Sequence, residues 1–510
     1  MFRSSRSTRA IVGIAAAGAI ALLAWPAPAT AQVKDKDKDK DRDVSRETQP
    51  DAELRRRVEP MIPSVRAALR GDNPDAQRAA LAAVAEFPPG LLFQANLSGA
   101  IAAFLQKEHR DPDLIAFGIR SYGKSYPESP EAAAAVLRRY QKSEHVEVRR
   151  AVADALVSLV LTVVPSSRSV ADAKPFIDAS AAALPVLADV LEDPDAITQK
   201  SALGAVQTIA RVVIELYTFD TGPVGEEPKP KEGENRFAPL APVLKGLAGV
   251  VPKLAFPLAS ADTDARIAAA RTIEYLAGVR RVVMAGPAVG GKTPQDPRAD
   301  GWPTLRASVT ARMRDPDPMV RLAITEALDA VGDAQAARPF LRAATADRNV
   351  FVRWAAARAL GRTAPPKAEA AAVVDDVAAL SRLVPDSDID VRMAGLNALA
   401  RFGPAARPST PVVLVAATRG DIEPRVVALR TLAAMESGAA ETVPALIDGL
   451  QNSDVRLRRA AASGLIRFGA DARPAIPELR RALSSTDQDL KLAAAEAILA
   501  IERPARLKDL

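Results

Sequence analysis

The sequence predicts an all-α protein, a solenoid of about eleven helix pairs. Its 510 residues are too many for one ordinary compact core, which favours several domains or a repeat array. Hydrophobic residues make up 48% of the chain and aromatic residues only 4%, so alanine, leucine and valine dominate. Alanine and leucine favour helices, whereas strands prefer β-branched and aromatic side chains. The third observation is a repeat of fixed length near the C-terminus.

The first segment, residues 1–31, has the features of a secretory signal peptide. Three arginines precede an apolar run over residues 10–25, which is short for a membrane span. Ala29 and Ala31 then fit a cleavage site, so the mature chain is expected to begin at Gln32. We therefore expect an exported bacterial protein, periplasmic or extracellular. An uncleaved membrane anchor is the alternative.

Residues 32–50 follow as a charged tether, because alternating lysine and aspartate cannot bury apolar area. The formal charge is +6, and without the three arginines of the signal segment about +3 remains. This charge is too small for general binding of polyanions, so nucleic acid is not an expected partner. No later run of about 18 apolar residues predicts a further membrane span. The absence of cysteine excludes disulfides and thiolate chemistry.

The repeat occupies residues 51–510 and is most regular over residues 303–502. Pro411, Pro444 and Pro477 recur at a spacing of 33 residues. Proline fits the first turn of a helix, where its missing N–H has no partner, so each proline predicts the start of a first helix. A short polar turn and a second helix follow each of them.

Each second helix carries a basic residue in its first turn. Apolar residues stand one before it, seven after it and ten after it, and these offsets share one helix face. Alanines between them allow close packing, so stacked pairs bury a continuous core. The basic positions are Arg149, Arg266, Arg321, Arg353, Arg392, Arg425, Arg458 and Lys491.

Two insertions interrupt the array, at about residues 218–238 and 282–302. Both are rich in glycine, proline and charge, so we expect long loops. Such loops either recognise a binding partner or are insertions that the repeat array tolerates without a function.

The second-helix pattern resembles that of HEAT repeats, in particular the short bacterial type also found in phycobilin-lyase proteins. Asp317 to Arg321 followed by residues 323–332 carries the resemblance, and so does the stretch from Asp388 to Gly403. The resemblance implies a right-handed α-solenoid. It does not imply one function, because this architecture serves many partners.

The basic column has two interpretations, an anion-binding surface or a structural ladder. The resemblance implies the ladder, in which each arginine binds acids or carbonyls of the turns between repeats, and the planar guanidinium suits such pairs. The expected ladder consists of Arg321, Arg353, Arg392, Arg425 and Arg458.

A candidate binding face follows from the same register. In HEAT-like solenoids the second helices line the concave surface, so residues one and five after each ladder arginine should point outward. Aromatic side chains and arginine are enriched at the centres of interfaces. The alternative is that the first of these columns packs against the first helices. The candidate binding residues are Trp354, Arg358, Met393, Asn397 and Arg430.

One enzyme-like motif is present. Residues 286–293, GPAVGGKT, match the phosphate-binding pattern G-x-x-x-x-G-K-T. A working site needs a strand before it and a helix after it, but a helix precedes it and Pro294 follows it. We therefore interpret the motif as part of a loop.

The two histidines, His109 and His145, stand in different repeats and fall short of a ligand cluster. No metal or cofactor is expected. The predicted function is an exported, non-catalytic scaffold that binds an unidentified protein through its concave face. The alternatives are a lyase-like or other enzyme with an acidic pocket in the groove, and a nucleic-acid-binding protein.

Overall fold

The computed structural model contains two units, Met1–Ala52 and Glu53–Leu510, and all described residues belong to the second. They are residues 56–87, 95, 97–125, 129–165, 169–219, 236–285, 302–330, 334–365 and 370–502. The predicted signal peptide, the charged tether and the motif at 286–293 lie outside the described residues, as do most residues of both insertions.

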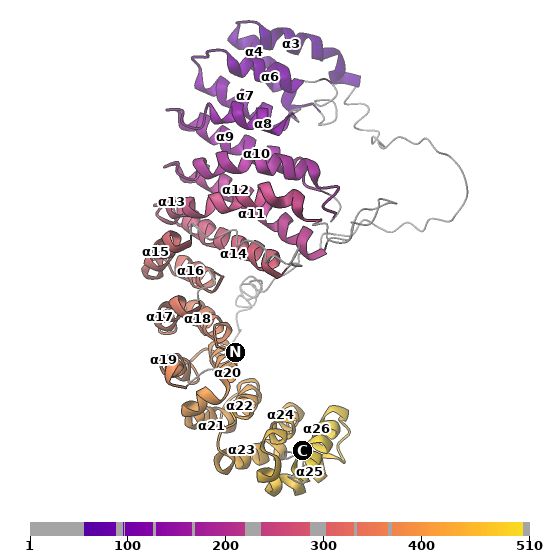
Figure 1. Cartoon of the computed structure of the whole chain (residues 1–510), viewed down its shortest axis with the longest axis vertical. Helices are drawn as coiled ribbons and strands as arrows, with labels where there is room; N and C mark the ends of the chain where they lie inside the picture. The colour runs from indigo at the N-terminus through magenta and orange to yellow at the C-terminus, as the bar shows by residue number, and fades with distance from the viewer. Residues whose placement is uncertain are drawn as a thin grey trace, which may run out of the picture. The chain divides into compact units, whose positions relative to one another are not determined.

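The described residues form helices and no strands, and the α-helices follow one another as eleven pairs (Figure 1). The first helices are α3 (Ile62–Arg70), α6 (Leu97–Gln106), α8 (Pro130–Arg138), α10 (Lys174–Val190), α12 (Ala241–Val250) with α13 (Ala255–Leu258), α15 (Trp302–Ala311), α17 (Ala334–Ala344), α19 (Ala370–Ser381), α21 (Thr410–Thr418), α23 (Ala439–Gln451) and α25 (Ile476–Ala482).

The second helices are α4 (Pro74–Ala85), α7 (Pro112–Lys124), α9 (Val146–Leu161), α11 (Ala196–Phe219), α14 (Thr263–Ala285), α16 (Pro318–Ala330), α18 (Val350–Arg362), α20 (Ile389–Phe402), α22 (Ile422–Ala434), α24 (Val455–Leu465) and α26 (Gln488–Glu502). Short 3₁₀ segments adjoin several of these helices. η3 (Ala238–Leu240), η6 (Gly403–Ser409) and η7 (Ile466–Ala475) precede a first helix, η4 (Val251–Leu254) lies between α12 and α13, and η5 (Arg312–Arg314) lies between α15 and α16. The all-α fold and its paired helices are thus confirmed.

Polar caps fix where the second helices begin. The Asn349 side chain accepts hydrogen bonds from the amides of Phe351 and Val352, at 2.9 and 3.3 Å, at the start of α18. Asp388 caps α20 in the same way. Each cap satisfies amides that have no partner within the helix. The turn residues therefore set the register of the face that follows.

One predicted helix start is wrong. Pro411 and Pro477 lie in the first turns of α21 and α25, as expected. Pro444, however, lies inside α23, which already begins at Ala439. A proline this close to the start removes only one early hydrogen bond, so the helix extends upstream of it as far as Gly438.

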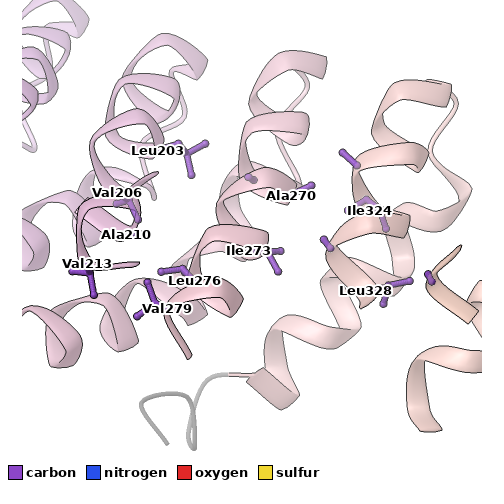
Figure 2. Close-up of a cluster of buried hydrophobic side chains, with 14 of the residues drawn as sticks. Leu203, Val206, Ala210, Val213, Ala270, Ile273, Leu276, Val279, Ile324 and Leu328 are labelled. Atoms are coloured by element: carbon purple, nitrogen blue, oxygen red, sulfur yellow. The ribbon is translucent and has the colours of Figure 1, made fainter. Parts of the chain in front are cut away.

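Each second helix packs against the second helix of the next pair, and the first helices form a neighbouring layer. Figure 2 shows this core across α11, α14 and α16. Buried side chains from three successive pairs meet there, so no pair has a core of its own. The labelled residues are Leu203, Val206, Ala210, Val213, Ala270, Ile273, Leu276, Val279, Ile324 and Leu328.

Two segments are long and apolar enough to cross a membrane, judged by length and hydropathy alone: α11 and Ala238–Leu258. In α11, 50% of the apolar window is buried inside the protein. This helix packs between α9 and α14, so the core accounts for its composition. The second segment is divided among η3, α12, η4 and α13.

Candidate binding face

The ladder arginines join neighbouring repeats, and Arg353 shows how. Its Nε and Nη2 donate to the two carboxylate oxygens of Asp386, at 2.8 and 2.9 Å. Its Nη1 donates to the carbonyls of Asp347 and Arg348, at 3.0 and 3.2 Å. Those carbonyls belong to the turn before α18, whereas Asp386 lies in the turn before α20. One planar side chain therefore connects two consecutive turns.

Arg321 repeats this geometry one pair upstream. It donates to both oxygens of Asp347, at 2.7 and 2.8 Å, and to the carbonyls of Asp315 and Pro316. Further upstream, Arg266 and Arg149 form the same kind of contact with Asp315 and Asp193, at 2.9 and 2.6 Å.

The ladder loosens toward the C-terminus. Arg392 pairs with Asp421 at 2.7 Å, but the Asp421 side chain is 63% exposed. Arg425 lies 3.5 Å from Asp448, and Arg458 donates only to the carbonyls of Asn452 and Ser453. Exposed pairs contribute less because water screens them. The strongest contacts thus lie between residues 149 and 386.

The carboxyl partners are held ionised. Burial raises the pKa of Asp386, but the hydrogen bonds from Arg353 and the Asp388 amide outweigh burial, so its pKa lies below the ordinary value. The pKa of Asp347 is lowered in the same way, by Arg321 and the Asn349 amide against burial. Both aspartates thus stabilise the fold as anions.

The five candidate binding residues lie on three successive second helices. On α18, the Arg358 guanidinium carbon lies 4.3 Å from the centre of the Trp354 ring, which is a cation–π contact. On α20 and α22, Asn397 and Arg430 are exposed and Met393 is half-buried. The structure therefore places an aromatic–arginine pair beside exposed polar side chains.

The column one residue after each basic ladder position is mostly half-buried, although Leu492 is 61% exposed. Trp354 and Ile267 pack against the core, and Val426 is 9% exposed. The column five residues after it is more open, since Arg271, Asn397, Arg430, Ser463 and Glu496 are exposed. The outward surface of these helices therefore rests mainly on the second column.

The sequence reasoning missed one further turn of this face. Arg362, Arg401 and Arg467 stand nine residues after a ladder arginine and are exposed. A shift of four residues is one helical turn, so Arg362 on α18 and Arg401 on α20 lie on the same face as the column at five, whereas Arg467 lies past the end of α24 in η7. Their regular distance from the ladder arginines is the sequence signal that identifies them.

Glu326 is the one carboxyl group in the described ranges whose pKa is raised. Burial raises it, while Arg271, Arg358 and Arg362 act in the opposite direction. Its charged neighbours are arginines on flanking helices and not a second carboxylate. The geometry of a paired-acid site is therefore not formed around it.

The two histidines have different surroundings. His109 Nε2 lies 2.8 Å from the carbonyl of Phe104, and the two rings are 4.1 Å apart. It borders an open cleft of about 410 Å³ that Lys107, Arg139 and Tyr140 also line. His145 is exposed at the start of α9. Among the residues that the structure describes, no three His, Asp or Glu side chains gather as metal ligands would.

Comparison with known proteins addresses the family. HEAT repeats match residues 307–400 and 409–499, the segment from α15 to α26. The part of the chain from α15 to α26 therefore consists of HEAT repeats. A crystal structure of an engineered protein is similar to it at 20% identity, with a TM-score of 0.47, over 87% of this chain and 99% of that one. No curated protein matches this HEAT-repeat chain.

Proposed function

We propose that this HEAT-repeat protein is an exported, non-catalytic scaffold that binds a partner protein through the second-helix face of α18, α20 and α22. One observation carries the proposal: Trp354 and Arg358 form a cation–π pair beside the exposed Asn397 and Arg430. Tryptophan and arginine side chains at the centre of an interface, with polar residues around them, are typical of binding hot spots. HEAT repeats typically serve as protein-binding scaffolds.

The rigidity of the array supports this role. The ladder contacts of Arg321 and Arg353 fix α18 relative to α16 and α20, so this part of the face is formed before a partner arrives. A preorganised surface loses less conformational entropy on binding, and more of the contact energy remains as affinity.

The proposal is tested by affinity capture with the mature chain from residue 32. We expect Trp354→Ala with Arg358→Ala to release the captured protein. Phe340→Ala with Arg382→Ala is the matched control, since Phe340 is an exposed aromatic residue on the first helix α17 and Arg382 is an exposed arginine in the turn after the first helix α19. Capture that survives in the first double variant, or is lost equally in the control, would place the interaction elsewhere.

The proposed export rests on the N-terminal segment and has its own test. A C-terminally tagged chain should appear outside the cytoplasm and start at Gln32 by N-terminal sequencing. A full-length cytoplasmic chain would contradict it.

The acidic-pocket enzyme remains an alternative with less support, because the carboxyl group with the raised pKa, Glu326, faces arginines. A catalytic role there would need a second acid within reach.

A further inference from the structure

The second helices α18, α20 and α22, and the 3₁₀ segment η7 that follows α24, carry a row of arginines. These residues stand five or nine after the ladder arginine of their pair, so those on the helices share one face, and Arg467 in η7 follows two residues after the end of α24. We call this set the basic strip: Arg358, Arg362, Arg401, Arg430 and Arg467. The remaining side chains at these positions are neutral: Asn397, Ala434 and Ser463. At these positions the side chains are therefore positive or neutral, and Glu326 on α16, one second helix upstream, interacts with Arg358 and Arg362.

Close helix packing places the members of the strip side by side. A Cβ built on Gly361 would lie 3.0 Å from the Ala398 Cα and 3.4 Å from the Arg401 Cδ, so Arg401 extends along the end of α18 beside Arg362. One helix further, the Thr431 hydroxyl donates to the Leu396 carbonyl at 3.1 Å. That contact brings Arg430 next to Asn397.

The same alignment continues into α24. A Cβ on Gly464 would lie 3.6 Å from the Ala433 Cβ. Ala434 and Ser463 are the residues next to these two. The strip therefore runs across the helices and not along one of them.

Within the described residues, Glu326 acts on Arg358 and Arg362, so the unneutralised charge of the strip lies at its other three members. Arg401, Arg430 and Arg467 are exposed, and none of the three makes an ion pair there. The ladder arginine of α18, by contrast, is fully engaged with Asp386. The negative end of the helix dipole favours a cation near a C-terminus, which explains Arg362 and Arg401. It does not explain Arg430, which lies in the interior of α22.

The spacing of the strip indicates the shape of its ligand. Packed helices lie about 8–10 Å apart. An extended polypeptide rises about 3.3 Å per residue, so every third residue advances by about one helix spacing. Arginine binds carboxylates through two parallel hydrogen bonds, and Asn397 and Ser463 can bind a peptide backbone.

We propose that the basic strip binds an extended acidic segment of the partner protein, with a carboxylate at about every third residue. This inference rests on the proposed scaffold function and names the chemistry of its partner. A general polyanion site has less support, since the mature chain has a net charge of only about +3.

Two fluorescent peptides of identical composition test the spacing. One repeats Asp-Ser-Gly, and the other places all its aspartates together. Fluorescence anisotropy with the mature chain should show tighter binding of the spaced peptide by about tenfold. Equal affinities, or preference for the clustered peptide, would overturn the spacing argument.

The variants test the location. Arg401→Gln, Arg430→Gln and Arg467→Gln together should weaken binding of the spaced peptide by about tenfold, as expected for the loss of three partly screened ion pairs. The matched control changes Arg348, Arg382 and Arg419 to Gln, because these arginines are also exposed but lie in the turns between a first and a second helix. Equal loss in both triple variants would overturn the assignment. Circular dichroism melting checks that both remain folded.

Two further probes separate this inference from its competitors. Tighter binding of an oligothymidylate or of phosphatidylglycerol vesicles, lost in the strip variant, would assign the strip to nucleic acid or lipid and reject the acidic peptide. If neither peptide binds while the captured protein still depends on Trp354, the inference fails and the scaffold function stands.

Discussion

At the scale of single residues, the ladder arginines differ in how much they should stabilise the fold. Arg353 satisfies one carboxylate and two carbonyls, and the Asp386 side chain is only 11% exposed. Arg458 satisfies two carbonyls and no carboxylate in the described part of the chain. Both positions match the same sequence pattern, so the sequence could predict the column but not this difference. The turn before α26 does supply Asp487, but the neighbouring Arg459 binds it in place of Arg458.

Arg353→Met should therefore lower the free energy of unfolding by about 2 kcal/mol, because it leaves Asp386 without its charged donor. Arg458→Met should cost less, since only carbonyl contacts are lost. Urea denaturation of both variants measures the contrast. An equal loss of stability in both variants would mean that the ion pair between Arg353 and Asp386 contributes little to the free energy of unfolding.

The pH dependence of stability follows from the same aspartates. The pKa values of Asp347 and Asp386 are lowered in the folded state, so both groups stabilise the fold above their unfolded pKa of about 3.9. This stability is lost as the pH falls through the lowered folded values. We expect unfolding in acid below about pH 4, with a shallower pH slope for Asp386→Asn. An unchanged slope would exclude Asp386 from this effect.

At the scale of elements, helix starts could be predicted where a side chain sets them. The turns before α18 and α20 supply the capping residues Asn349 and Asp388. These caps fix the residue at which each second helix begins, and therefore which of its side chains share a face. The helix start predicted at Pro444 was wrong because a proline near the start of a helix allows a helical turn before it. The arginines nine residues after a ladder arginine, such as Arg362 and Arg401, could be read from the sequence. Only the packing of the helices shows that they lie beside one another.

The close approach of α18 and α20 gives an element-scale prediction. Gly361→Ala should destabilise the protein, because the new Cβ would lie 3.0 Å from the Ala398 Cα on the neighbouring helix. Gly204→Ala is the control, since nothing lies within 4 Å of a Cβ there. That change should instead stabilise by up to about 1 kcal/mol through helix propensity. Thermal melting should show a lower melting temperature for Gly361→Ala and a higher one for Gly204→Ala. A higher melting temperature in both variants would mean that α18 and α20 can move apart without loss of stability.

At the scale of the whole molecule, the second unit is an array in which each pair depends on its neighbours. The buried side chains of α11, α14 and α16 form one core across three pairs (Figure 2). Composition and a period of 33 residues were enough to predict such an array. Neither could predict the partner, because one repeat architecture serves many different partners.

Site-specific photo-cross-linking in living cells tests the central claim most directly, that the second-helix face binds a protein. A photoreactive amino acid replaces Asn397, which is exposed on α20, or Val374, which is 56% exposed on the first helix α19. We predict a discrete cross-linked protein from position 397 and none from position 374. Cross-links from position 374 alone, or from neither position, would contradict the assignment of this face as the binding surface.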